Sequence, residues 1–170
     1  MYSSRRLTSW NMNGGAHLKL LSPSIRSYLR KFDVVLLQET HLLSAQEDII
    51  PWPEDYDVFL QCRVDPLNGK RQSGGVATLV RKSLNAIKRV NLCREDMLCV
   101  ILGDGSAVLN LYAPPAGSVF LPRRQEAPLE ALEDAIVLLH EEGRQVFIGG
   151  DLNGHTNDRQ AANGPASRLS

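Results

Sequence analysis

Cysteine is scarce in this sequence, and the few cysteines follow no recognisable pattern. Only Cys62, Cys93 and Cys99 occur among 170 residues, and no two of them have the CxxC spacing. An odd number of cysteines at such spacings argues against a disulfide-rich scaffold and against a four-cysteine zinc site, and it favours a reducing compartment. We therefore expect three free thiols, buried in or beside strands.

Long apolar runs are also missing. The runs that do occur, at residues 34–37 and 135–139 for example, fall far short of the roughly 18 residues of a membrane span. Arg5 and Arg6 lie near the N-terminus, but the apolar segment of a signal peptide does not follow them. These absences predict an intracellular protein, nuclear or cytoplasmic, without a membrane partner.

Neither sign of charge is in excess, since 19 Lys and Arg balance 19 Asp and Glu. The distribution is uneven, however, because residues 126–142 contain six acidic residues and neither Lys nor Arg. The rest of the chain thus holds all 19 basic residues and the other 13 acidic ones. Basic pairs recur there, Arg5-Arg6 and Lys88-Arg89 among them. Such pairs could contact a polyanion, or they could be solvated ends of loops and strands.

Hydrophobic periodicity predicts a mixed α/β sandwich in a single domain. Pro23 marks the start of one helix, and a second, amphipathic helix at about 129–139 ends before Gly143. Continuous apolar runs at 34–37 and 146–148 predict buried strands. Shorter runs separated by turn residues predict further strands at 6–12, 56–64, 75–81, 87–92, 98–102 and 108–111.

Four polar clusters follow predicted strands. They are Trp10–Gly14, Leu37–Thr40, Asn110–Pro114 and Gly149–Asn153. Ligand crevices in α/β layers form at the carboxyl ends of strands, so we expect these polar side chains at the rim of the core. Two carboxylates, several amides and one phenol have the composition of a phosphoester site. In such a site the carboxylates bind a hard cation and the amides hold phosphate oxygens.

Five sequence blocks carry a resemblance to a known family. They are Ser9–Gly14, Leu37–Leu42, Gly74–Val80, Asn110–Pro114 and Gly150–Asn153. In this order they resemble the endonuclease/exonuclease/phosphatase superfamily, which includes DNase I, the apurinic/apyrimidinic endonucleases and the endonuclease domains of LINE-type (non-LTR) retrotransposons. Within the superfamily, these blocks resemble the retrotransposon endonucleases most. The resemblance implies a DNase I-like four-layer α/β sandwich, with two mixed, mostly antiparallel sheets between outer helices.

The resemblance also implies a metal site. Glu39 matches the family's metal-binding glutamate, for which Mg²⁺ or Mn²⁺ is the expected ion. Asn11 matches an asparagine that helps to hold both the metal and the phosphate. Asn13 matches a phosphate-side position that is Asp in some relatives and Asn in the retrotransposon type.

Three more residues match the part of the family's site that acts on the phosphate. Tyr112 matches a tyrosine that contacts the scissile phosphate. Asp151 matches an aspartate that orients or deprotonates the attacking water, and Asn153 matches the asparagine beside it that contacts the phosphate. Without the other blocks, Asp151 and Asn153 could simply form a turn, because both side chain types bond to nearby backbone. Trp10 is expected to be a core residue rather than a base-stacking one.

The sequence departs from the family near its C-terminus. Relatives carry a further aspartate and a Ser-Asp-His-type motif there, whereas Asp158 and His155 are the only later acid and histidine in this chain. We therefore expect residues 1–170 to form an endonuclease/exonuclease/phosphatase domain without its C-terminal part. One sheet would be nearly complete and the second half of the sandwich incomplete. His155 is a poor substitute for the missing histidine, since it lies only four residues beyond Asp151.

These observations predict a magnesium-dependent DNA endonuclease of retrotransposon type, with doubtful activity in the chain as it stands. Two alternatives stay open. One is a phosphatase or phospholipid phosphodiesterase of the same superfamily. The other is a non-catalytic remnant that binds nucleic acid or pairs with another chain. Such a partner chain, or a second copy in an oligomer, would cover the incomplete sandwich.

Overall fold

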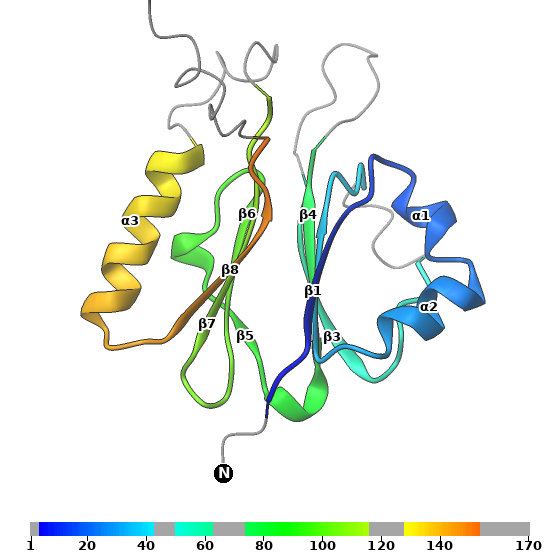
Figure 1. Ribbon diagram of the computed structural model, residues 1–170, viewed down its shortest axis with the longest axis horizontal. Coiled ribbons are helices and arrows are strands. Elements are labelled where there is room, and N and C mark those ends of the chain that lie inside the picture. Colours follow the sequence, from blue (N-terminus) through cyan, green and yellow to red (C-terminus); the bar gives the residue numbers. More distant parts are fainter. Residues whose placement is uncertain (1–3, 43–49, 63–73, 116–127, 154–170) are drawn as a thin grey trace, which may run out of the picture.

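Two four-stranded sheets pack face to face in the part of the chain that the computed structural model describes, residues 4–42, 50–62, 74–115 and 128–153 (Figure 1). The first sheet has the strand order β1-β2-β4-β3 and the second β5-β6-β7-β8. Helices cover the two outer faces, α1 and α2 on the first sheet and α3 on the second (Figure 1). This arrangement confirms the predicted DNase I-like α/β sandwich.

Each sheet combines one parallel pair with antiparallel pairs. In the first sheet β1 runs parallel to β2, and in the second β7 runs parallel to β8. The strands of the first sheet are β1 (Leu7–Asn11), β2 (Val34–Gln38), β4 (Val76–Arg81) and β3 (Tyr56–Gln61). Those of the second are β5 (Ile87–Lys88), β6 (Met97–Ile101), β7 (Ala107–Tyr112) and β8 (Val146–Asp151).

The helices follow from the sequence signals that predicted them. α1 spans Ala16–Lys19, α2 spans Pro23–Leu29 and α3 spans Pro128–Glu141. Proline is tolerated at the start of α2 because the first amide groups of a helix have no partner within it. The chain leaves α3 through Gly143, whose φ of 70° is a left-handed conformation that suits glycine. Among the described residues, no helix is long and apolar enough to cross a membrane.

Three apolar layers hold the sandwich together. One lies between α1, α2 and the first sheet, and includes Leu20, Leu29 and Leu37. A second lies between the two sheets, where Leu36 and Val108 are buried. The third packs α3 onto the second sheet. β2 is buried along its whole length because it contributes to two of these layers, as its continuous apolar run predicts.

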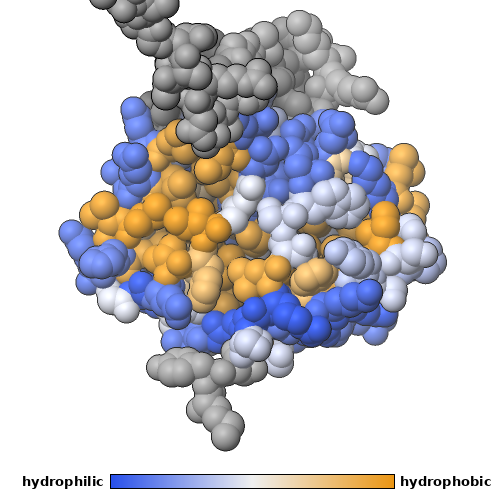
Figure 2. Space-filling view, in the orientation of Figure 1, coloured by the Kyte–Doolittle hydropathy of each residue, from blue (hydrophilic) through white to orange (hydrophobic). Residues whose placement is uncertain are grey.

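The structure corrects the prediction that residues 146–148 form a buried strand. β8 lies at the edge of its sheet, with β7 as its only neighbour among the described residues, and Ile148 is 50% exposed. Hydrophobic side chains gather at the surface over β8 and α3 (Figure 2). A run of three apolar residues does not reveal whether both faces of a strand are covered, because the covering elements come from elsewhere in the chain.

Two further predictions are also wrong in part. The run 87–92 forms only the short strand β5 followed by the 3₁₀ helix Val90–Leu92. Of the three cysteines only Cys99 is buried, and the other two are partly exposed.

Candidate active site

A single asparagine side chain connects two carboxylates at the carboxyl ends of three strands. Asn11 is the last residue of β1, and its Nδ2 donates hydrogen bonds to Glu39 Oε1 at 2.7 Å and to Asp151 Oδ2 at 2.6 Å. Glu39 directly follows β2, whereas Asp151 ends β8 of the other sheet. The structure thus joins residues that are 140 positions apart in the sequence.

Strand register explains why these side chains meet. Asn11 pairs with Gln38 in the parallel β1–β2 ladder, which places Glu39 one residue beyond the end of the pair. Asp151 pairs with Tyr112 at the end of the parallel β7–β8 ladder. Parallel strands bring their carboxyl ends to the same edge, and the two sheets pack with these edges side by side. The polar clusters predicted at strand ends therefore do converge.

The orientation of the Asn11 amide is fixed by the main chain. The backbone N–H of Asn13 donates to Asn11 Oδ1 at 2.8 Å, so the amide nitrogen is directed toward the two carboxylates. Asn13 contributes this N–H, while the residue itself is exposed. Asn13 therefore supports the site through its backbone N–H. The phosphate contact expected of its side chain stays a prediction.

The segment that carries Glu39 adopts a strained backbone conformation. Glu39 and His41 have φ values of 47° and 52°, a left-handed region that residues other than glycine rarely occupy. Main-chain hydrogen bonds hold the segment: Gly14 N to Glu39 O (2.7 Å), Ala16 N to Thr40 O (3.4 Å), Thr40 N to Gly75 O (3.1 Å) and His41 N to Gly74 O (3.0 Å). Strain of this kind persists only where neighbouring structure imposes it, and it clusters at functional sites.

Glycine is required beside this segment. A Cβ atom on Gly14 would lie 2.3 Å from His41 Nδ1, and the φ of Gly14 is 74°. His41 Nε2 in turn lies 3.5 Å from Glu39 Oε2, and both side chains are about four-fifths buried. His41, which the sequence did not single out, therefore packs against the metal-binding glutamate of the resemblance. Its only signal in the sequence was its place in the second block.

The Asp151–Asn153 segment is both a turn and a part of the site. The N–H of Asn153 donates to Asp151 Oδ1 at 3.0 Å, which is the turn geometry considered as the simple alternative. Asp151 still accepts from Asn11 with its other oxygen. Asn153 Nδ2 donates to Ala113 O at 3.0 Å, next to Tyr112, which is 7% exposed. His155 lies outside the described residues.

The donor set suits a divalent cation on chemical grounds. Glu39 and Asp151 bond to the same neutral amide, and among the described residues no Lys or Arg pairs with either carboxylate. Two partly buried carboxylates with no Lys or Arg partner in the described ranges suit an ion that prefers oxygen ligands. Within the described ranges no group of three His, Cys, Asp or Glu side chains is placed so that it could hold a metal ion.

Two amide side chains of the polar clusters lie in the core, although both were expected at its rim. Gln38 is 1% and Asn110 is 0% exposed. Gln38 Nε2 donates to Asn110 Oδ1 at 2.7 Å, and Asn110 Nδ2 donates to the carbonyl oxygen of Ala77 at 2.9 Å. These bonds cross between the sheets directly below Glu39. The two amides therefore support the site from within the sandwich.

Asp96 is a buried acid that sequence reasoning missed. It precedes β6, is 0% exposed and has a φ of 61°. Its Oδ1 accepts from the N–H of Gly75 at 2.6 Å, and its carbonyl oxygen accepts from the N–H of Tyr112 at 2.9 Å. Asp96 thus connects the loop that holds Thr40 with the strand that ends at Tyr112. No short-range pattern marks it, because it stands in a polar turn, Arg94–Asp96.

Comparison with known sequences agrees with this geometry. The sequence profile of the Endonuclease/Exonuclease/phosphatase family matches residues 8–170. The chain belongs to this family. The match includes all five sequence blocks and every residue of the candidate site. No curated protein matches the chain significantly by sequence.

Three solved structures illustrate what this chain is similar to in fold. The AP endonuclease LMAP from Leishmania major has a TM-score of 0.68 and 20% identity over 91% of this chain and 56% of that one. The endonuclease domain of TRAS1, a telomere-specific non-LTR retrotransposon, has a TM-score of 0.56 and 16% identity, covering 90% and 61%. TDP2 from C. elegans has a TM-score of 0.56 and 21% identity, covering 89% and 48%.

These likenesses show the fold alone, because all three sequence identities are low. The chain spans little more than half of LMAP and about three fifths of the TRAS1 domain.

Proposed function

We propose that this chain carries the site of a metal-dependent phosphodiester hydrolase that acts on DNA, as an endonuclease of the retrotransposon type. The observation that carries the proposal is the Asn11 amide, which donates at 2.7 Å to Glu39 and at 2.6 Å to Asp151. Membership of the family supports the hydrolase chemistry. The similar folds of an AP endonuclease and a retrotransposon endonuclease support DNA as the substrate.

In this proposal Glu39 and Asn11 hold Mg²⁺ or Mn²⁺. When bound, the ion supplies positive charge beside the phosphoryl oxygens. Asp151 accepts the proton of a water molecule whose oxygen attacks phosphorus. The bond from phosphorus to the leaving oxygen breaks as the new bond forms, and a solvent water molecule protonates the leaving oxygen. Asn11 keeps Asp151 oriented, because it bonds to one carboxylate oxygen while the N–H of Asn153 holds the other.

The phosphate is held by neutral groups in the same proposal. Tyr112 and the amides of Asn13 and Asn153 are hydrogen-bond donors at or beside the strand ends, whereas both N–H groups of the Asn11 amide already bond to Glu39 and Asp151. Neutral donors stabilise the charge that develops on phosphoryl oxygens without repelling the metal. Their main-chain anchors are already formed, since Asn153 bonds to Ala113 and Ala113 N donates to Asp151 O at 2.8 Å.

Nicking of supercoiled plasmid in the presence of Mg²⁺ tests the proposal. We expect Glu39→Ala and Asp151→Asn each to lower the nicking rate about 100-fold or more, as single-group losses do at other electrostatic sites. Glu133→Ala, an exposed glutamate on α3, serves as the matched control and is expected to nick at the wild-type rate.

Three outcomes would contradict the proposal. Nicking that persists in Glu39→Ala would show that another group acts. Cleavage of a phosphoinositide but not of plasmid would assign the chain to the phosphatase and phospholipid phosphodiesterase side of the family. A folded wild-type chain that cleaves neither substrate would be the non-catalytic remnant.

A further inference from the structure

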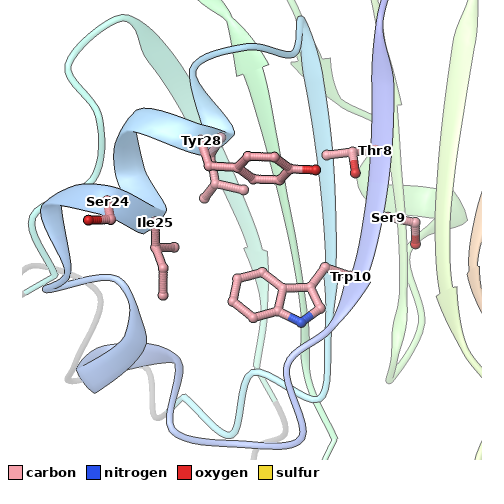
Figure 3. Close-up of a pocket in the computed structure, with 7 residues that line it drawn as sticks. Thr8, Ser9, Trp10, Ser24, Ile25 and Tyr28 are labelled. Atoms are coloured by element: carbon pink, nitrogen blue, oxygen red, sulfur yellow. The ribbon is translucent and has the colours of Figure 1, made fainter.

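A pocket opens between the edge strand β1 and helix α2, on the face of the first sheet opposite the second sheet (Figure 3). Its volume is about 470 Å³. Trp10 and Thr8 of β1 point into it, as do Ile25 and Tyr28 of α2, whereas Ser9 points to the other side of the strand (Figure 3). Trp10 packs partly against the core, as expected, but its indole also forms a wall of this open pocket.

The two aromatic walls are each accompanied by a lysine. Lys19 Nζ lies 5.9 Å from the ring centroid of Trp10, and Lys31 Nζ lies 5.3 Å from that of Tyr28. Tyr28 is 54% exposed, so its ring is available to a ligand. Lys19 Nζ also donates to the main-chain oxygen of Met12, which keeps the ammonium group close to the pocket. The pocket therefore combines flat apolar surfaces with fixed positive charge.

The surroundings of the pocket are basic. Residues 4–32, which include β1, α1 and α2, contain no Asp or Glu, and the first acid is Asp33. The same segment contains six basic residues: Arg5, Arg6, Lys19, Arg26, Arg30 and Lys31. A chain of zero net charge thus concentrates positive charge beside this pocket. The ligand that fits best is an anion with a planar, apolar part.

The pocket adjoins the candidate site along β1. Trp10 directly precedes Asn11, and alternation along the strand directs the two side chains to opposite faces of the sheet. β1 is also the edge of its sheet, with β2 as its only neighbour among the described residues. A linear ligand that leaves the site at Asn11 therefore reaches the pocket by following β1.

We propose that the Trp10–Tyr28 pocket binds a base of a single-stranded nucleic acid segment, while Lys19 and Lys31 contact the flanking phosphates. Bases of any sequence stack on aromatic side chains, and a basic surface follows the backbone of the strand. The inference rests on the proposed function for the kind of polymer, and it adds a contact beyond the cleaved phosphate. An extended polypeptide along β1 would fill the pocket without using the lysines.

Binding of a 5′-fluorescein-labelled dT10 oligonucleotide, followed by anisotropy in EDTA, tests this inference. EDTA prevents cleavage, so binding is measured whether or not the chain is an active nuclease. We expect Trp10→Leu and Tyr28→Leu each to weaken binding about tenfold or more, because each removes a stacking surface. Trp52→Leu, the same change at the only other tryptophan, is the matched control and is expected to bind dT10 as the wild type does.

Two further measurements separate stacking from charge. A decamer with the same phosphates but no bases is expected to bind at least about tenfold more weakly than dT10. Raising the salt concentration from 50 to 200 mM is expected to weaken dT10 binding about sevenfold if two phosphates are neutralised, and less in Lys19→Gln/Lys31→Gln. Circular dichroism verifies that each variant folds, and the abasic comparison needs no variant at all.

The inference fails if dT10 does not bind, if the abasic decamer binds equally well, or if Tyr28→Leu binds like Trp52→Leu. If dT10 does not bind, an extended polypeptide becomes the expected ligand of the pocket. If the wild type nicks plasmid but Trp10→Leu and Tyr28→Leu bind dT10 as tightly as the wild type, this inference fails and the proposed function stands. Base-dependent binding without nicking would overturn the proposed function alone.

Discussion

Replacement of Asn110 by leucine is expected to weaken the sandwich directly below the candidate site. Asn110 is completely buried and bonds across the sheets to Gln38, to the carbonyl oxygens of Leu37 and Ala77, and to the hydroxyl of Thr78. Leucine has a similar size but offers no polar group. The substitution therefore removes hydrogen bonds without creating a large cavity.

The magnitude follows from the groups that lose a partner. In the described part of the chain, Gln38 Nε2 has Asn110 Oδ1 as its only acceptor, and Gln38 is 1% exposed. One buried unsatisfied amide costs about 1–3 kcal/mol, and the weaker loss at the two carbonyl oxygens adds about 1 kcal/mol. We expect Asn110→Leu to lower the free energy of unfolding by about 2–4 kcal/mol.

A double-mutant cycle measures this effect cleanly. Gln38→Met removes the stranded amide, because replacing both partners of a buried hydrogen bond by apolar groups costs little. We expect Gln38→Met/Asn110→Leu to be more stable than the sum of the single effects predicts, by about 1–2 kcal/mol. Equilibrium unfolding in urea, followed by tryptophan fluorescence and by circular dichroism, gives the four free energies.

Additive single effects would refute the reasoning. They would mean that Gln38 finds another partner when Asn110 is lost, so that the amide pair does not couple the sheets. Loss of stability in Asn110→Leu with no loss in Gln38→Met would also be inconsistent, since Asn110 Oδ1 then loses its donor.

Three other predictions concern separate parts of the fold. Gly150→Ala is expected to disrupt the β7–β8 pairing and to lower the free energy of unfolding by about 3 kcal/mol or more. This is the magnitude expected when backbone strain is added to the loss of a contact between strands. The cause is that its Cβ would lie 1.9 Å from Leu111 O at a φ of 150°, and urea unfolding tests it. Burial raises the pKa of the Cys99 thiol to about 12, so at pH 8 we expect a thiol reagent to modify it only after unfolding. Arg5 and Ser106 lower the pKa of Asp104 to about 2, so the pair stabilises the fold above about pH 4 and this contribution is lost as the pH falls toward 2. Because Asp104 is exposed, Asp104→Asn is expected to cost less than about 1 kcal/mol at pH 7, and a larger change in thermal unfolding would refute this.

Local patterns in the sequence were sufficient to predict most of the helices and strands. The apolar run of β2, the proline at the start of α2 and the apolar spacing of α3 each depend on neighbours within a few residues. They are therefore visible in the sequence. The polar clusters at strand ends and the five blocks also indicated which side chains would gather. Asn11, Glu39 and Asp151 do lie together, as the resemblance implies.

Tertiary structure alone decided how these side chains are held. The bond from Asn11 to Asp151 joins two sheets, and no spacing in the sequence encodes which oxygen of which carboxylate accepts it. The left-handed conformations of Glu39 and His41 are held by main-chain bonds to Gly14 and to Gly74, which lie in other segments of the chain. Local preference opposes these conformations, so only the surrounding fold makes them possible.

Burial was likewise beyond the reach of local pattern. Asn110 and Asp96 are polar residues that a sequence places at a rim or in a turn, and both are completely enclosed. Ile148 is an apolar residue that a sequence places in the core, and it is half exposed at a sheet edge. Residue type and spacing determine which face of a strand a side chain occupies. What covers that face depends on packing between segments far apart in the chain, and in this protein that packing positions the site.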